Sequence, residues 1–500
     1  MLAVEEALTT QRTPALNGAQ SYLRKRWPEC FTVVAFAAVV SYAIPFHEPW
    51  ADEAQAWQLA RSLSLPDLLL HHIRYEGSTG LWHLLLWVMI QLHVTYSGMH
   101  WICGAIAVAG TSVLVFRSPF PRYLKLALPF TNFLIFQYAV VARSYVLAIA
   151  MMFLIATWWK RRPAWIPVLL GVLANVSLHA AVISGGLAVI FYSEQLREWK
   201  WSNSSYRRAL VQSSMAIAGL YGFALWTAWP PHDLLTSQLR VESPSVIGLA
   251  IKSLVWGIAQ PFILAVPFWI GICVCLRARR SLRYLLPVLL FALFSGVVHF
   301  TWWHIGLLIL LVITIVWITW PQGAGRLSPF ESAGRYAMVF MTAIQILWSG
   351  YALHYDHYNA YSPDLAAAEL LRPLIQKGAT VAVTHLDTAP NDHDFQAVGI
   401  LPYFDHNIYL NQPDSFWWWS ANNPTEKLFV SVLRSRPAII VVEVRDRGLL
   451  YPFPAQHPRV KLLVEAGYHP TNLFCGYMPA AFKLGLSDCH LIFQRTNPQP

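Results

Sequence analysis

The amino-acid sequence predicts a polytopic α-helical membrane protein with a C-terminal α/β domain. Of the 500 residues, 56% are hydrophobic and only 12% are charged, and the mean hydropathy is +0.42. Several apolar segments approach about 20 residues, the length that crosses the hydrocarbon core of a bilayer. After residue 353 the chain becomes polar and richer in proline. We therefore expect roughly 10–13 membrane helices in residues 29–353 and a soluble extracytoplasmic domain in residues 354–500.

The positive charge of the chain indicates its orientation rather than a nucleic-acid partner. The formal net charge is +10, but the basic runs 160–162, 207–208 and 277–283 lie in short loops between apolar segments. Cytoplasmic loops of membrane proteins carry this excess of lysine and arginine. We expect these loops inside the cell and no nucleic-acid binding.

Residues 1–28 read as a polar cytoplasmic lead, because Arg24, Lys25 and Arg26 precede the first apolar segment at 30–46. An acidic loop, and not a small-residue cleavage site, follows this segment, so we expect it to be retained as a membrane helix. Residues 47–79 then form the first outer loop. Within the loop, residues 52–65 have the pattern of an amphipathic surface helix that is interrupted at Pro66.

The next two apolar segments, 81–94 and 99–116, lead to a conflict. If both cross the membrane, the basic turn from Arg117 to Arg122 lies outside, against the positive-inside rule. Either one segment is partial or the rule fails once, and the sequence leaves both explanations open.

The remaining segments follow the rule. The first of them, 123–141, is expected to run outward, and the count places the C-terminal region outside the cytoplasm. In that region, helices are expected at 363–376 and 424–434, and strands at 379–384, 438–444 and 490–494. This order favours a largely parallel sheet. Cys475 and Cys489 could pair there, although their spacing does not decide it.

The candidate functional site begins in the first outer loop, where Asp52 and Glu53 lie within a turn or two of the lipid boundary. Carboxylates so close to hydrocarbon are costly and usually functional, although an ordinary acidic loop in water is the alternative. Other polar or aromatic residues lie at the outer ends of predicted spans: His47, His72, Arg74, Tyr75, Glu76, Arg143, Tyr145, His179, Trp303 and His304. Singly, each has an ordinary structural explanation, but together they predict an interfacial active site.

The residue types indicate a chemistry. A half-buried carboxylate is a general base for a hydroxyl or an amine, and an arginine beside it suits a phosphate, because the guanidinium fork is planar and stays charged. A base, a phosphate site and a membrane boundary together suggest a lipid-phosphate donor. Glu76 with His71, His72 or His304 has acceptable ligands for a divalent metal ion. No spacing is diagnostic, so we assign no metal ligands and leave the need for a metal open.

The chain resembles the GT-C superfamily in four features. The members of this superfamily are polytopic glycosyltransferases that use polyprenyl-phosphate-linked sugars. The four features are the acidic pair after the first span, the surface helix, the Tyr75-Glu76-Gly77 segment leading into Leu-Trp-His-Leu-Leu-Leu-Trp at 81–87, and the run from Ala142 to Tyr145. The likeness covers roughly residues 30–350. It is nearest to bacterial proteins similar to protein O-mannosyltransferases and lipid A aminoarabinose transferases.

The resemblance implies roles for four residues. Asp52 would be the base that deprotonates the acceptor, Glu53 would support it or contact the acceptor, and Arg143 would hold the donor phosphate. Glu76 matches a second acidic position that in relatives helps to bind a metal or the donor. Relatives often carry a proline-rich run before the second segment, whereas this chain has Gly77 to Gly80, which puts the role of Glu76 in doubt.

The sequence therefore predicts an inverting glycosyltransferase of the bacterial inner membrane. It would move a sugar from a lipid-linked donor to a glycan, lipid or protein acceptor on the outer face. Two rivals stay open. A transporter or flippase would need ionisable groups deep within spans or paired broken helices in matching halves, which the sequence does not favour. The second alternative is a non-catalytic protein with the same fold that acts as a scaffold in the cell envelope.

Overall fold

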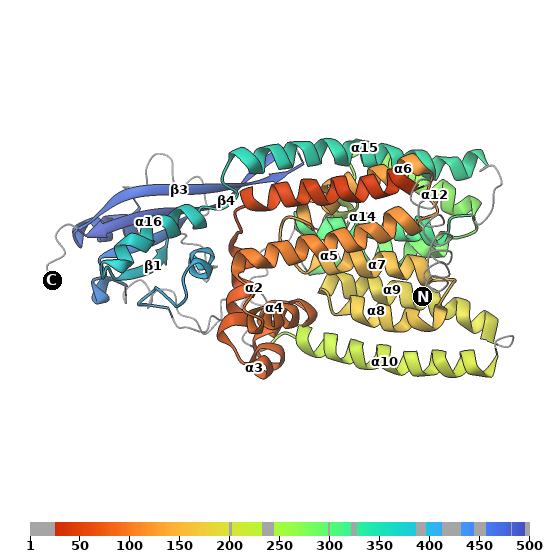
Figure 1. Ribbon diagram of the computed structural model, residues 1–500, viewed down its shortest axis with the longest axis horizontal. Coiled ribbons are helices and arrows are strands. Elements are labelled where there is room, and N and C mark those ends of the chain that lie inside the picture. Colours follow the sequence, from red (N-terminus) through yellow and green to blue (C-terminus); the bar gives the residue numbers. More distant parts are fainter. Residues whose placement is uncertain are drawn as a thin grey trace, which may run out of the picture.

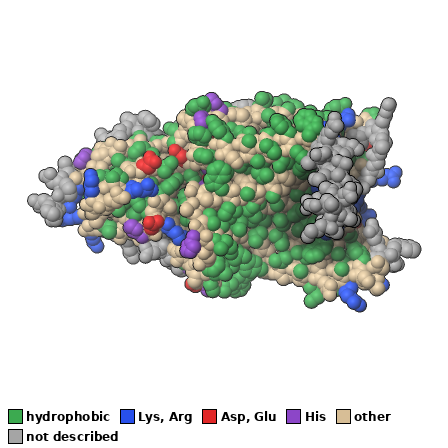
Figure 2. Space-filling model, in the orientation of Figure 1, with side chains coloured by type: hydrophobic (Ala, Val, Ile, Leu, Met, Phe, Trp, Pro, Cys, Tyr) green, Lys and Arg blue, Asp and Glu red, His purple; other side chains and the backbone are tan. Residues whose placement is uncertain are grey.

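The computed structural model is mostly helical, with a bundle of apolar helices and a small C-terminal sheet at one end (Figure 1). It describes residues 26–199, 203–232, 245–298, 301–321, 328–386, 397–412, 432–444, 457–481 and 483–495. On the face drawn in Figure 2, hydrophobic side chains cover the middle of the bundle, and charged side chains lie toward the two ends. This distribution is compatible with a protein that crosses a membrane.

Four helices in the described ranges are long and apolar enough to cross a membrane: Arg26–Phe46, α5 (Tyr96–Arg117), α10 (Ser204–Ala228) and α15 (Pro329–Tyr358). With 21–30 residues each, they extend at least about 30 Å, the thickness of the hydrocarbon core. The other apolar helices have 10–17 residues when the 3₁₀ turns leading into them are counted. These are α4 (Leu81–Gln91), α7 (Tyr145–Trp158), α8 (Ile166–Ala174), α11 (Val246–Val255), α12 (Ala265–Ala278), α13 (Leu286–Val297) and α14 (Trp302–Ile318).

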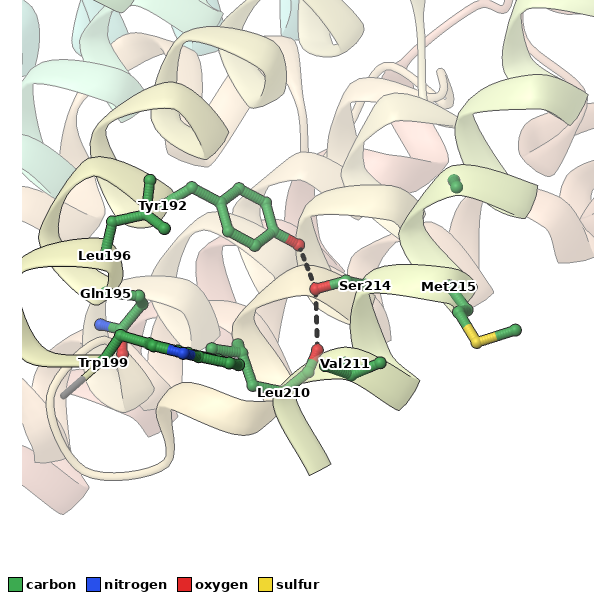
Figure 3. Close-up of a pocket in the computed structure, with 9 residues that line it drawn as sticks. Tyr192, Gln195, Leu196, Trp199, Leu210, Val211, Ser214 and Met215 are labelled. Atoms are coloured by element: carbon green, nitrogen blue, oxygen red, sulfur yellow. Dashed lines mark hydrogen bonds between the residues drawn. The ribbon is translucent and has the colours of Figure 1, made fainter. Parts of the chain in front are cut away.

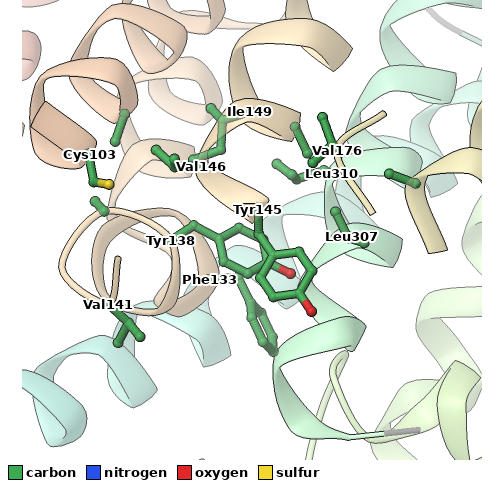
Figure 4. Close-up of a cluster of buried hydrophobic side chains, with 14 of the residues drawn as sticks. Cys103, Phe133, Tyr138, Val141, Tyr145, Val146, Ile149, Val176, Leu307 and Leu310 are labelled. Carbon is green, nitrogen blue, oxygen red and sulfur yellow. The ribbon is translucent and has the colours of Figure 1, made fainter. Parts of the chain in front are cut away.

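Helix α14 lies at the centre of the bundle. Every residue from His304 to Ile318 is buried, as expected of a helix that is apolar on all sides. Its residues Leu307 and Leu310 lie among the side chains of Tyr138, Tyr145 and neighbouring apolar residues (Figure 4). The packing fixes the N-terminal end of α14, where Trp303 and His304 are found.

The structure bears on the conflict over the basic turn. Helix α4 has only 11 residues, which extend about 17 Å and are too short to cross the core. The end of α5 lies beside the start of the first helix, because Arg26 Nη1 donates to the Phe116 carbonyl at 3.1 Å and Lys125 Nζ is 2.9 Å from Glu29 Oε1. The length of α4 is compatible with the first explanation, a partial segment, and the basic turn lies at the same end of the bundle as Arg26.

The expectation of one continuous span at 123–141 is wrong. The chain forms α6 (Arg122–Ala127), a 3₁₀ turn at Leu128–Phe130 and a short π-helix, η4 (Phe133–Gln137). Pro129 lacks an N–H and cannot continue an α-helix from its preceding turn. The irregular stretch after η4 brings Ala142 and Arg143 to the end of the bundle nearest the sheet.

The C-terminal region forms a four-stranded sheet in the order β1-β2-β4-β3. Its strands are β1 (Val381–His385), β2 (Ile439–Val444), β3 (Tyr468–Ala480) and β4 (Lys483–Arg495), accompanied by α16 (Asp364–Gln376) and α18 (Pro458–Glu465). The expected strands fall on β1, β2 and β4, and the expected helix at 363–376 on α16. The helix expected at 424–434 lies largely outside the described residues.

The prediction of a largely parallel sheet is wrong. Only β1 and β2 pair in parallel, and β4 is antiparallel to both β2 and β3. Strand β3 went unpredicted because it contains Pro470, Gly476 and Pro479, residue types that strands usually exclude. It is an edge strand, where proline is tolerated. Cys475 and Cys489 face each other across the β3–β4 hairpin and form a disulfide.

The sheet is attached to the helices at two points. The Tyr477 N–H donates to the Ala360 carbonyl just beyond α15 at 3.0 Å. Arg61 Nη1, on α2 (Ala51–Ser62), donates to the Phe404 carbonyl at 2.7 Å, next to the 3₁₀ helix η10 (Val398–Tyr403). Helix α2 therefore lies at the junction between bundle and sheet (Figure 1).

The packing of α9 (Leu178–Glu198) on α13 yields a test of the fold. A Cβ added to Gly186 would lie 2.6 Å from the Cα of Pro287, so backbone would have to move. We expect Gly186→Ala to lower the free energy of unfolding by about 1–3 kcal/mol, measured as a lower melting temperature in detergent. The matched control is Gly219→Ala on α10, where nothing lies within 4 Å. It should be neutral or stabilising because alanine favours helix, and equal behaviour of the two variants would contradict this packing.

Candidate functional site

The first turn of α2 presents the acidic pair. The helix begins after Trp50, and Asp52 and Glu53 occupy its first turn, where the positive end of the helix dipole favours carboxylates. Successive residues of a helix point about 100° apart. Asp52 consequently faces partly outward, with 19% of its side chain exposed, whereas the Glu53 side chain is fully buried.

The Glu53 carboxylate is the centre of a buried hydrogen-bond network. Its two oxygens accept from four groups: the N–H of Ala142 (2.6 Å), His100 Nε2 (3.0 Å), the N–H of Trp50 (3.2 Å) and His47 Nε2 (3.4 Å). Burial alone would raise the pKa of Glu53, but the hydrogen bonds and charges of the two imidazoles hold it well below its ordinary value. Glu53 therefore fixes structure and does not line an accessible site.

Asp52 forms an ion pair with Arg143. The guanidinium carbon also lies over three aromatic rings, at 5.2 Å from the Trp303 centroid, 5.5 Å from Tyr145 and 5.6 Å from Trp50. Aromatic faces attract cations most strongly away from water. Only 20% of the Arg143 side chain is exposed, so the rings hold a nearly desolvated positive charge beside the Asp52 carboxylate.

Glu76 completes the acidic group. It follows a 3₁₀ turn, η2 (His72–Tyr75), and accepts a hydrogen bond from Gln55 Nε2 on α2. Burial raises the pKa of Glu76 to about 8, and the nearby charge of Asp52 acts in the same direction, against the opposing effects of Gln55 and Arg143. Near pH 7 the Glu76 carboxyl group is therefore mostly protonated, and it lies close to the Asp52–Arg143 pair.

Aromatic and imidazole rings extend the site along the bundle. His304 stacks on His179 with centroids 4.0 Å apart, and the Tyr145 and His304 rings meet edge to face with centroids 5.8 Å apart. His304 Nδ1 accepts from the Thr301 N–H at 3.3 Å and lies 2.8 Å from the Thr301 hydroxyl, so the proton of the neutral ring is assigned to Nε2. Tyr145, His179, Trp303 and His304, which the sequence placed at separate helix ends, therefore form one row beside Arg143.

Other candidates from the sequence lie away from this row. Arg74 Nε donates to the Trp229 carbonyl at 2.8 Å, and its guanidinium lies 5.5 Å from the Trp226 ring, so it ties the first loop to the end of α10. His72 Nδ1 is 3.1 Å from the Asp67 carbonyl, and Tyr75 is half-buried on η2. His47 lies on the far side of Glu53, where Nδ1 is 3.1 Å from Asp356.

Sequence reasoning missed several residues of the site. Gln55 lies one helical turn after Asp52, and this i, i+3 spacing could have revealed it. Trp50 stood in the acidic stretch but was not assigned. Glu48 was passed over as well: it lies near His47 and Asp356 behind the site, and burial raises its pKa to about 7. His100 and Asp356 carry no local signal, because their partners lie 47 and 309 residues away in the chain.

The residues that the sequence offered as acceptable metal ligands form no group of three among the described residues. Among the described residues, the three potential ligands whose atoms lie within 4.8 Å of one another are His47, Glu53 and His100. Glu76 with His71, His72 and His304 forms no such group in that part of the chain. Glu76 instead holds its hydrogen bond to Gln55.

A cavity of about 350 Å³ lies elsewhere, between α9 and the half of α10 nearer Arg207 (Figure 3). Its polar groups satisfy one another, because the Tyr192 and Ser214 hydroxyls lie 2.8 Å apart and Ser214 donates to the Leu210 carbonyl at 2.7 Å. The remaining lining is mostly apolar. None of the described residues that line this cavity is an acid, a base or a phosphate-binding group, so it is a weaker candidate than the Asp52 site.

Comparison of the chain with family models, with curated proteins and with solved structures finds no match. The case for a function consequently depends on the residues of the site.

The raised pKa of Glu76 predicts a pH effect on stability. Its pKa is about 8 in the folded protein against an ordinary value of 4.5, so ionisation destabilises the fold as the pH rises between these values. Glu76→Gln mimics the protonated form at every pH. The melting temperature of the variant minus that of the wild type should therefore increase between pH 5 and pH 8. Glu369→Gln, an exposed carboxylate on α16, is the control. A constant difference between Glu76→Gln and wild type would contradict the assignment.

Proposed function

We propose that this protein is a membrane glycosyltransferase of the GT-C type, which transfers a sugar from a polyprenyl-phosphate carrier to an acceptor. The observation that supports the proposal most strongly is the Asp52–Arg143 pair beside Trp50, Tyr145 and Trp303. It combines a base, a phosphate-binding cation and ring faces suited to a sugar. These groups lie where the apolar bundle meets the sheet, as a lipid carrier with a polar head requires.

The transfer would be a single displacement with inversion. Asp52 accepts the proton of the acceptor hydroxyl while its oxygen attacks the anomeric carbon of the sugar. The bond between that carbon and the phosphate oxygen breaks, and the lipid phosphate leaves with the electron pair. Arg143 stabilises the charge that develops on the phosphate. The protonated Asp52 then releases its proton to solvent.

Arg143 would bind two partners in succession: Asp52 before the donor binds, and the donor phosphate after the donor has bound. The donor phosphate is a diester with one negative charge, like a carboxylate, and its two free oxygens accept a bidentate pair of hydrogen bonds from a guanidinium. Its arrival would compete with Asp52 for Arg143 and leave the carboxylate to accept a proton. Glu76, protonated near pH 7, would donate a hydrogen bond to a substrate oxygen rather than act as a second base.

We also propose that the site and the C-terminal sheet lie on the outer face of the bacterial inner membrane. The turn from Arg117 to Arg122 lies beside Arg26 at the opposite end of α5 from His100 and the site, as the positive-inside rule requires. The Cys475–Cys489 disulfide supports the same orientation, because disulfides persist in oxidising compartments.

The rival functions receive less support. A transporter would need ionisable groups along a path through the bundle, whereas the acids and histidines of this site gather at one end of it. A scaffold would have no need for an ion pair of an arginine and a carboxylate that are both mostly buried, with 20% and 19% of their side chains exposed. The arrangement is better suited to chemistry than to permeation or to assembly alone.

Asp52→Asn tests the base. The purified protein is assayed in detergent with a panel of radiolabelled polyprenyl-phosphate sugars and an envelope extract as the source of acceptor. The measured quantity is the radiolabel transferred from each donor to the acceptor. We expect wild-type transfer with one donor and a loss of about 10²–10⁴-fold in the variant. Asp67→Asn, an exposed residue of the same loop, should keep wild-type activity. Equal rates for Asp52→Asn and wild type would exclude Asp52 as the base.

Arg143→Lys tests the phosphate site. Lysine keeps the charge but loses the planar fork and its stacking on the three rings. We expect the KM for the donor to rise about tenfold, which corresponds to about 1.4 kcal/mol, with a smaller change in the KM for the acceptor. An unchanged donor KM and kcat would mean that Arg143 only anchors Asp52.

A further inference from the structure

A second set of reactive groups lies directly behind the Asp52 site. Both imidazoles that hydrogen-bond to Glu53 direct Nε2 at its carboxylate, His100 toward Oε1 and His47 toward Oε2. The side chains of His47 and Glu53 are fully buried, and that of His100 is 4% exposed. Two nitrogens and two oxygens thus converge from three side chains at one point shielded from solvent.

The spacing of these atoms suits a small metal ion. A tetrahedral site with bonds of about 2.0–2.1 Å has edges of about 3.3–3.4 Å. The two nitrogen–oxygen distances are 3.0 and 3.4 Å, and all three ligand groups lie within 4.8 Å of one another. Rotations of the imidazoles about their side-chain bonds would close the remaining gap between the two nitrogens.

Asp356 provides the support that metal-binding histidines usually have. It lies 3.1 Å from His47 Nδ1, on the opposite side of the ring from Glu53. A carboxylate at this position fixes the tautomer that presents Nε2 to a metal and strengthens the ligand. The backbone N–H of Ala142 orients Glu53 in the same way from behind.

The charges also balance. Glu53 and Asp356 are both buried, with 0% and 2% of their side chains exposed, so two negative charges need compensation. One divalent cation with two neutral imidazoles compensates them completely. Two protonated imidazoles would do the same, and the experiment below separates these two states.

We propose that His47, Glu53 and His100 bind a structural divalent transition-metal ion of the zinc class, with Asp356 as the outer support of His47. Nitrogen and carboxylate ligands are typical of zinc. The site differs from the Asp52–Arg143 pair and does not depend on the proposed transferase activity. The ion would hold the first turn of α2, the start of α5 and the stretch before Arg143 in one arrangement.

The experiment measures metal in the full-length protein, purified in detergent without chelators, supplied with Zn²⁺ and desalted. We expect about one zinc per chain by elemental analysis, and a visible d–d absorption band of tetrahedral type after exchange with Co²⁺. Removal of the ion by a strong chelator should lower the melting temperature, and zinc should restore it. A monodisperse wild-type protein without stoichiometric metal would overturn the proposal and leave two protonated imidazoles as the explanation.

Variants locate the ion. His100→Ala should reduce the zinc content at least tenfold and abolish the Co²⁺ band. Asp356→Asn keeps the three ligands and should weaken zinc binding about 10–100-fold, as loss of an outer support does. His71→Ala, at an exposed histidine of the same loop region, should keep the full content. If His100→Ala does not fold, the wild-type metal content and Co²⁺ spectrum still decide, and retention of zinc in a folded His100→Ala protein would contradict the site.

Discussion

The buried carboxylate of Glu53 is the constraint on which the rest of the site depends. An ionised carboxylate removed from water costs several kcal/mol unless hydrogen bonds and positive charge compensate it. The compensating groups come from residues 47–50, which lead from the helix Arg26–Phe46 into α2, from the start of α5 and from the turn before α7. Three segments that are separate in the chain therefore meet at one residue, and they form the floor of the site.

This constraint also explains why two adjacent acids have different roles. Because Glu53 points into the protein, its neighbour Asp52 points to another side of α2, where 19% of its side chain is exposed. The Ala142 N–H that satisfies Glu53 is followed at once by Arg143, which pairs with Asp52. One buried hydrogen bond thus positions both members of the reactive pair. An Asp–Glu dipeptide serves this arrangement because the Glu53 carboxylate organises the structure and the Asp52 carboxylate stays available for the proposed role as a base.

Features encoded locally were predictable, and features that depend on distant partners were not. The pattern at residues 52–65 predicted a helix, and α2 lies there, but the expectation of an amphipathic surface helix is wrong, because nine of the twelve residues of α2 are buried. The helix also ends at Ser62, because Pro66 opens the next helix, α3 (Leu65–Leu70), instead of closing this one. Helix-end positions placed Arg143, Tyr145, His179 and His304 at one face, and the structure joins them in a row. His100 and Asp356 could not be predicted from the sequence, because only the folded chain brings His100 to Glu53 and Asp356 to His47. The strand β3 was not predicted because its prolines are typical of loops. Proline is tolerated in β3 because this strand lies at the edge of the sheet.

The path of contacts continues from the acidic pair into the C-terminal region. Glu53 contacts His47, His47 contacts Asp356 near the end of α15, and Ala360 just beyond α15 accepts the hydrogen bond that anchors β3. On the other side, Arg61 at the end of α2 binds the Phe404 carbonyl. Helix α2 is therefore held at its start through α15 and at its end through η10. A displacement of the sheet relative to the bundle would strain both attachments, so the position of Asp52 cannot be independent of the C-terminal domain.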